Sequence, residues 1–149
     1  MSTWKPHVTV AAIVEHSGQF LMVEEHTVDG VRLNQPAGHL EEHESLADAC
    51  VRETLEETAH HVRVDSLVGI YQWTRPDGAI TYLRFVFACR LLGEEQGRAL
   101  DEGIIRAAWL NPEELRAEPL RLRSPMVMQC LEDYLAGHRF PLDLVRSWV

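Results

Sequence analysis

The sequence has little cysteine and no long apolar run. Its three cysteines, Cys50, Cys89 and Cys130, are widely spaced and form no Cys-x-x-Cys pair, which argues against a disulfide framework and a thiolate zinc site. No apolar stretch approaches the ~20 residues that span a bilayer, and residues 1–6 do not resemble a signal peptide. We therefore expect reduced, buried thiols in a cytoplasmic protein without a membrane partner.

Positive charge is also scarce. The 149 residues include 14 lysines and arginines against 23 aspartates and glutamates, and the formal net charge is −9. Such an acidic chain argues against nucleic acid as the partner. It does not exclude an anionic small molecule, because a bound Mg²⁺ can reverse the local field. The length suits one domain with a substantial core, which we expect to cover residues 1–149.

Apolar runs separated by proline, glycine and asparagine predict strands on both sides of one central helix. Residues 7–14 are apolar and β-branched, which indicates a strand buried on both faces. The polar stretch 24–33 is interpreted as a loop or a second tight turn at Asp29-Gly30. This order of elements favours an α/β fold, with a mixed sheet sandwiched by helices. The other predicted elements are strands over 20–23, 62–73, 80–92 and 104–110, and helices that begin after Asn111 and Ser124.

The central helix is predicted over residues 45–59. Ser45 is a suitable N-cap, and nothing breaks a helix between Leu46 and Ala59. At about 100° per residue, one side of this helix is expected to be mainly apolar and the opposite side acidic. The first side consists of Ala47, Val51, Leu55 and Thr58, and the second of Glu53, Glu56 and Glu57.

The acidic side is unfavourable unless something compensates its charge. Glu53 precedes Glu56 by three residues and Glu57 by four, so neighbouring carboxylates repel by roughly a few tenths of a kcal/mol per pair. One alternative is an ordinary solvated acidic face. The other is a divalent ion, because Mg²⁺ binds a few carboxylates while it keeps waters and contacts substrate phosphates.

These acids belong to a longer pattern, which is Gly38, five residues, Glu44, seven residues, Arg52-Glu53, two residues, Glu56-Glu57. This spacing resembles the Nudix box, the hallmark of the Nudix hydrolase family. Thr54 and His60 replace aliphatic residues of the box, and Ala59 replaces its closing glycine. The alanine costs about 1 kcal/mol if the helix end requires a positive φ. None of the three departures removes an acid.

The resemblance implies a Nudix α/β/α sandwich with a catalytic loop-helix-loop, and Mg²⁺, or Mn²⁺ in its place, as cofactor. Glu44 would hold Arg52 or a metal-bound water, and Glu53 would be a further metal ligand or the general base. The candidate metal ligands are Glu53, Glu56, Glu57 and the carbonyl of Ala37, and the candidate catalytic residues are Glu53, Glu44 and Arg52.

Other candidates lie outside the box. The family often supplies a further acid from a distant loop, where this chain has Asp101 and Glu102; a solvated pair is the alternative. Arg84 is predicted in mid-strand, where an unpaired guanidinium is costly, so it pairs with an acid or contacts a substrate phosphate. Trp73 stacks on an aromatic ring or belongs to the core. Gln35 completes the candidate substrate-binding residues.

Four segments resemble more closely the NudJ-type phosphatase branch of the family: residues 5–11, 34–41, 83–85 and 122–125. This branch removes the terminal phosphate from hydroxymethylpyrimidine diphosphate, thiamine diphosphate and nucleoside di- and triphosphates. The resemblance therefore implies a Mg-dependent phosphoanhydride hydrolase that releases orthophosphate from a small diphosphate or nucleotide, as a monomer or homodimer.

Two alternatives stay open at this point. The first is another Nudix specificity, such as a nucleoside triphosphate pyrophosphohydrolase, or an isomerase of the same fold. The second is a catalytically inactive nucleotide-binding module. The complete set of acids argues against the second, because a protein that only binds would not need them.

Overall fold

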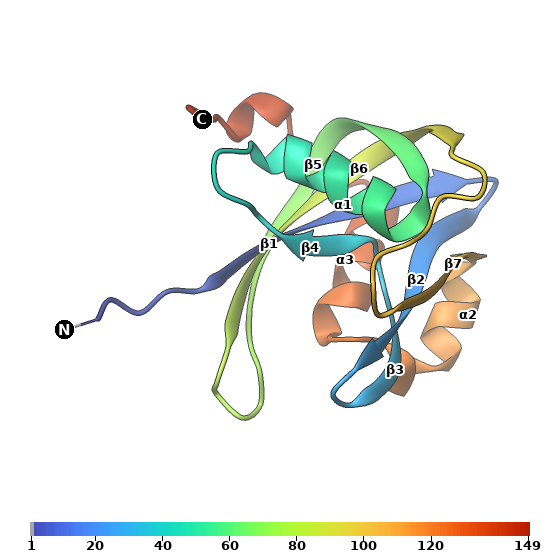
Figure 1. Cartoon of the computed structure of the whole chain (residues 1–149), viewed down its shortest axis with the longest axis horizontal. Coiled ribbons are helices and arrows are strands. Elements are labelled where there is room, and N and C mark those ends of the chain that lie inside the picture. Colours follow the sequence, from blue (N-terminus) through green and yellow to red (C-terminus); the bar gives the residue numbers. More distant parts are fainter. Residues whose placement is uncertain (1) are drawn as a thin grey trace.

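The structure, a computed structural model, describes residues 2–149. A seven-stranded mixed sheet lies between helices on its two faces (Figure 1). The strands are β1 His7–His16, β2 Gln19–Thr27, β3 Gly30–Asn34, β4 Ala37–His39, β5 His60–Thr74, β6 Thr81–Glu94 and β7 Ile104–Leu110. The helices are α1 Leu46–Thr58, α2 Pro112–Ala117 and α3 Pro125–Leu135, with short 3₁₀ turns η1 Pro119–Arg121 and η2 Leu142–Leu144.

Strand β1 occupies the centre of the sheet. The order is β3-β2-β1-β6-β5, with β4 paired to β1 and β7 paired to β2. β1 runs parallel to β6 and antiparallel to β2 and β4. Residues 10–14 of β1 expose at most 1% of their surface. The predicted strand with two buried faces is therefore confirmed.

Alternating side chains of the central strands build a separate core on each face of the sheet. Ala11 and Ile13 pack with Leu131 of α3, whereas Val10 and Ala12 pack with Cys50 of α1. Helix α1 thus covers one face, and α2 and α3 cover the other (Figure 1). This arrangement confirms the predicted α/β/α sandwich.

Helix α1 begins and ends as predicted, but its buried face is different. Ser45 accepts a hydrogen bond from the Asp48 N–H and caps the helix. Val51 and Leu55, from the side predicted to be mainly apolar, are partly exposed, so the apolar side is not the most buried one. The helix instead turns a face with two threonines and two acids toward the protein. Its buried residues are Ala49, Cys50, Glu53, Thr54, Glu57 and Thr58.

Of the two alternatives for the stretch 24–33, a loop is wrong and a tight turn at Asp29-Gly30 is close to the structure. The stretch forms most of a hairpin in which β2 and β3 pair from Val23/Asn34 to Thr27/Gly30, around a turn at Val28-Asp29. β7 lies on the other side of β2. Part of this hairpin lines a cavity. Polar side chains on β2 are for this reason compatible with a strand.

Two smaller expectations concern the cysteines and membranes. Cys50, Cys89 and Cys130 are free thiols, the first and third buried and Cys89 partly so. Among residues 2–149, no helix is both long enough and apolar enough to cross a bilayer.

Candidate active site

Helix α1 holds its glutamates against strand β4. Glu53 and Glu57 are 9% and 8% exposed, and Glu56 is partly exposed. Gly38 of β4 lies directly over the Glu53 carboxyl, where a Cβ atom at position 38 would overlap the carboxyl atoms. The absence of a side chain at Gly38 therefore makes room for Glu53 in the site.

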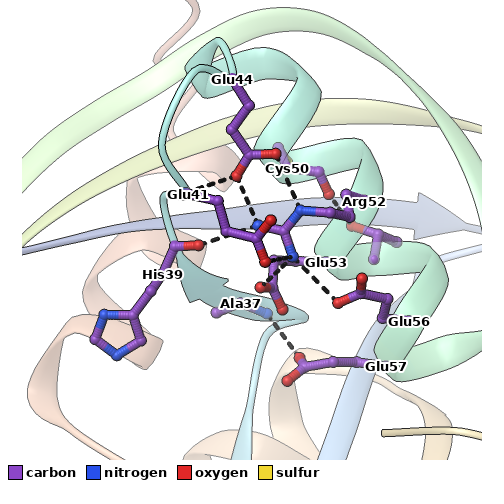
Figure 2. Close-up of polar contacts among 10 residues, drawn as sticks. Ala37, His39, Glu41, Glu44, Cys50, Arg52, Glu53, Glu56 and Glu57 are labelled. Atoms are coloured by element: carbon purple, nitrogen blue, oxygen red, sulfur yellow. Dashed lines mark hydrogen bonds and ion pairs between the residues drawn. The ribbon is translucent and has the colours of Figure 1, made fainter.

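Arg52 connects the acids of the helix to the loop that precedes it. Its guanidinium donates to Glu44 (2.7 and 3.0 Å), Glu53 (2.7 Å) and Glu56 (3.1 Å), as Figure 2 shows. It also donates to the carbonyl of His39 (3.1 Å). The Arg52 guanidinium lowers the pKa of Glu44, and the carboxylates in turn raise the pKa of Arg52. Glu44 therefore holds Arg52, one of the two roles that the resemblance implied for it.

Glu57 points away from Arg52 toward β4 (Figure 2). Its Oε1 accepts a hydrogen bond from the Ala37 N–H at 2.9 Å. Burial raises the pKa of Glu57 to about 8, and the nearby charges of Glu25, Glu53 and Asp101 act in the same direction. Burial also raises the pKa of Glu53, although Arg52 opposes that shift. The site thus holds buried negative charge that is only partly compensated.

Asp101 joins the acids from the loop between β6 and β7. Carboxylate oxygens of Glu53, Glu56 and Asp101 lie within 4.8 Å of one another. The Asp101 N–H donates to the Glu56 carbonyl (3.0 Å), which fixes this loop against the end of α1. Glu102 is exposed and lies outside the cluster, so the structure brings only one of the two candidate distal acids to the site.

These donors suit a hard divalent cation. Carboxylate oxygens are the ligands that Mg²⁺ and Mn²⁺ prefer, and soft thiolate donors are not part of the cluster. A cation beside them would offset the burial and the repulsion that together raise the pKa of Glu57. The residues present therefore fit the metal that the sequence pattern implies.

A cavity of about 450 Å³ adjoins the acids. Glu53 and Glu57 lie in its wall, and Trp73 and Tyr82 contribute stacked rings (centroids 6.1 Å apart, interplanar angle 12°). Charged residues from other elements complete it. They are Glu25, Asp29, Glu41, Arg75, Arg84 and Arg123. The cavity therefore combines carboxylates, guanidinium groups and aromatic rings.

A sequence model of the NUDIX domain matches residues 5–129. The chain belongs to the Nudix hydrolase family. It is 41% identical over 143 residues to the phosphatase NudJ of Escherichia coli strain K12, covering 95% of this chain and 92% of the relative. It is 49% identical to a NUDIX hydrolase from Nitrosomonas europaea, with a TM-score of 0.93 over 97% of this chain and 98% of that one. A UDP-X diphosphatase shares the fold, with a TM-score of 0.71 at 18% identity over 95% and 68% of the two chains.

In this Nudix hydrolase, Gln35 does not lie where a substrate-contacting residue would. It is 1% exposed, its Nε2 donates to the Val127 carbonyl (2.8 Å), and its Oε1 accepts from Arg84 (2.7 Å). Gln35 is absent from the residues that line the cavity, so the expected substrate contact is replaced by a supporting role. Its long side chain is instead used to hold Arg84 beneath the cavity.

Arg84 is buried without a carboxylate partner. It is 3% exposed and donates to the side-chain oxygens of Asn34 (3.2 Å) and Gln35 (2.7 Å). Its Nε makes no hydrogen bond within residues 2–149. Burial lowers the pKa of Arg84. Of the two alternatives for Arg84, pairing with an acid is not what the structure shows, because the side-chain amides of Asn34 and Gln35 are its partners.

Glu25 was not among the candidate residues of the site, and Arg123 was named only as part of the segment 122–125 that resembles the NudJ-type branch. The two residues are almost a hundred positions apart, and Glu25 fell in a stretch interpreted as a loop. The available signal was the pairing of Asp29-Gly30 with flanking β-compatible residues, which indicates a hairpin. Recognising that hairpin would have placed Glu25 on a strand.

Proposed function

We propose that this Nudix hydrolase removes the terminal phosphate from small diphosphates that carry an aromatic ring. The supporting observation is the cavity, which has metal-binding acids in one part and stacked aromatic rings in another. The candidate substrates are hydroxymethylpyrimidine diphosphate, thiamine diphosphate and nucleoside di- and triphosphates. The name of the relative, phosphatase NudJ, supports release of orthophosphate.

The proposed cofactor is Mg²⁺, with Mn²⁺ as a substitute. The clustered residues that would hold it are Glu53, Glu56 and Asp101. Glu57 and the carbonyl of Ala37, which line the adjoining cavity, are proposed as further ligands. Such an ion neutralises phosphate oxygens and lowers the pKa of a bound water. Burial raises the pKa of Glu57, and a nearby cation would stabilise its deprotonated form in addition to the hydrogen bond from Ala37.

Glu53 is the proposed general base. Arg52 binds its Oε1 (2.7 Å), and the carboxyl lies under Gly38, so its orientation is fixed. The carboxylate of Glu53 is the proposed proton acceptor. It takes the proton of the attacking water while the bond between the bridging oxygen and the terminal phosphorus breaks. Orthophosphate and the shortened phosphate ester are the products.

The aromatic part of the cavity would bind the ring of the substrate. Trp73 and Tyr82 offer stacked faces from β5 and β6, and such contacts are favourable for any flat heterocycle. Arg84 and Asn34 line the cavity beside them and can donate to ring nitrogens or oxygens. The cavity thus favours a compact aromatic diphosphate.

Product analysis tests this proposal. We expect orthophosphate to be released from the candidate substrates with Mg²⁺, and release to stop when EDTA is added. Glu57→Gln should lower turnover at least about a hundredfold with an unchanged circular dichroism spectrum, because it removes a ligand. Glu113→Gln, at an exposed position of α2, is the matched control and should keep full activity.

Two other outcomes would change the assignment. Pyrophosphate as the only product would favour a nucleoside triphosphate pyrophosphohydrolase or another Nudix specificity. Tight substrate binding without any product would favour an inactive nucleotide-binding module.

Full turnover by Glu57→Gln would remove that residue from the site.

A further inference from the structure

Arg123 forms an ion pair inside the cavity that leaves much of its guanidinium free. Its Nη1 donates to Oε1 of Glu25 on β2 at 2.5 Å. Its Nε and Nη2 make no hydrogen bond within residues 2–149. Because a guanidinium carries five N–H donors in one plane, several donors at this position remain available to a ligand.

The backbone fixes where this guanidinium lies. The Arg123 N–H donates to the Leu33 carbonyl (2.8 Å), and Leu122 forms a bridge with Leu33, so the segment is tied to β3. Glu25, at the other end of the ion pair, is 7% exposed and comes from the neighbouring strand. The pair is therefore held from both sides at the cavity wall.

The charges around the pair show that it lies beside the acids. Glu25 and Arg123 line the same cavity as Glu53, Glu57 and His39. His39 immediately follows Gly38, which covers Glu53. Arg123 therefore lies next to the part of the cavity where the phosphates would bind.

The other two arginines of the cavity are less suitable for a phosphate. Arg84 is 3% exposed, its Nη1 and Nη2 donate to Asn34 and Gln35, and its unpaired Nε is buried. Arg75 lies near Asp77 (3.7 Å) at the tip of the β5–β6 hairpin. Only Arg123 combines a fixed backbone, proximity to the acids and free donors; its side chain is 43% exposed.

We propose that Arg123 binds a phosphate of the substrate through the free edge of its guanidinium, and that Glu25 is the positioning residue that orients it. This inference rests on the proposed diphosphate substrate. Guanidinium groups bind phosphate through two parallel hydrogen bonds, which a lysine cannot reproduce. Glu25 keeps one edge of the fork occupied, so the other edge faces the cavity.

A neighbouring pair supplies a matched control. Arg121 and Glu24 also form an ion pair (3.1 Å), between η1 and β2, and the Arg121 side chain is 41% exposed. Neither residue lines the cavity. If the two ion pairs act only by attaching this segment to β2, removal of either pair should therefore change substrate binding equally.

Binding of methylenediphosphonate, a diphosphate that cannot be hydrolysed, tests the proposal by calorimetry in the presence of Mg²⁺. The double variant Glu25→Gln/Arg123→Gln removes both charges, so it leaves no buried unpaired carboxylate. We expect its affinity to fall about ten- to a hundredfold, the loss of a charged hydrogen-bonded contact. The double variant Glu24→Gln/Arg121→Gln should bind within about twofold of the wild type.

Two additional measurements separate a phosphate contact from a structural role. Arg123→Lys keeps the charge and loses the planar fork, so we expect about a tenfold loss of affinity. Affinity for Mg²⁺ alone, measured in Arg123→Lys, should not change, because Arg123 is not a metal ligand and the charge at this position is kept. An equal loss in both double variants would overturn the proposal, as would undiminished binding after removal of Arg123.

The proposed reaction can fail independently. If the protein binds methylenediphosphonate through Arg123 but releases no orthophosphate from any substrate, the proposed function is wrong and the inference about Arg123 holds. If Glu25→Gln/Arg123→Gln hydrolyses its substrates with unchanged KM, the inference is wrong and the proposed function holds. A wild-type protein that does not bind methylenediphosphonate would also overturn the inference.

Discussion

Gly38 shows how one missing side chain positions a candidate catalytic group. Its φ is not positive, so the backbone does not require glycine there. The requirement is space, since a Cβ atom would overlap the Glu53 carboxyl. The overlapping atoms are the end of a flexible side chain, which can move without disturbing the strand.

Gly38→Ala should therefore impair activity more than stability. The methyl group would displace the carboxyl of Glu53 from the cluster with Glu56 and Asp101, and we expect kcat to fall at least about tenfold. The unfolding free energy should change by less than about 1 kcal/mol. Steady-state kinetics and urea unfolding measure the two effects.

Gly93→Ala is the control for this prediction. Gly93 also lacks a positive φ, and a Cβ atom there would meet nothing within 4 Å. This variant should keep both activity and stability. Equal kcat values for Gly38→Ala and the wild type would mean that the position of the Glu53 carboxyl is not important for the reaction.

At the scale of elements, helix α1 buries two threonines where the Nudix box has an aliphatic residue and a free position. The Thr54 hydroxyl donates to the Cys50 carbonyl (2.8 Å) and the Thr58 hydroxyl to the Thr54 carbonyl (2.6 Å). Such bonds to the preceding turn satisfy a buried hydroxyl within the helix itself. The two threonines differ because Thr58 Oγ1 also accepts from the His60 N–H (3.2 Å).

Thr54→Val and Thr58→Val should therefore have opposite effects on stability. Valine at position 54 loses only a bond within the helix and gains apolar burial, so we expect stabilisation by up to about 1 kcal/mol. Valine at position 58 leaves the buried His60 N–H without its partner, which costs about 1–2 kcal/mol. Chemical denaturation of both variants measures this difference, and equal shifts of the same sign would contradict the interpretation.

Local signals predicted most of the elements, whereas contacts distant in sequence determined the rest. Ser45 as N-cap and the turn at Ser17-Gly18 are encoded within a few residues, and these predictions were confirmed. The buried side of α1 could not be predicted this way. Glu53 and Glu57 are buried because β4 crosses over them, a pairing with β1 that helical periodicity does not contain.

The candidate site divides in the same manner. The spacing of the box brought together Glu44, Arg52 and Glu53, which the structure shows in direct contact. The choice between Asp101 and Glu102 depends on a turn that binds the end of α1, and no local pattern distinguishes two adjacent acids.

At the scale of the whole molecule, the acids of the site add to a chain that already carries a net charge of −9. Glu57 has a pKa of about 8 in the folded protein and an ordinary value near 4.5 when exposed. The folded protein therefore binds more protons than the unfolded chain between these two values. Since stability falls with pH wherever the folded state holds the extra proton, Glu57 destabilises the metal-free protein progressively from about pH 4.5 to pH 8.

A divalent cation should reverse this trend, because it binds only the deprotonated carboxylates of the folded protein. In EDTA, we expect the unfolding free energy of the wild type to fall by on the order of a few kcal/mol relative to that of Glu57→Gln as the pH rises from about 5 to about 8.5. With Mg²⁺, the wild type should regain stability at the higher pH, and Glu57→Gln should regain much less. Sodium chloride at the same ionic strength controls for screening of the net charge and should not reproduce the difference. Urea unfolding at several pH values measures these effects. If the two proteins had parallel pH profiles in EDTA, the pKa of Glu57 would be ordinary. The charge of Glu57 would then be compensated without a metal.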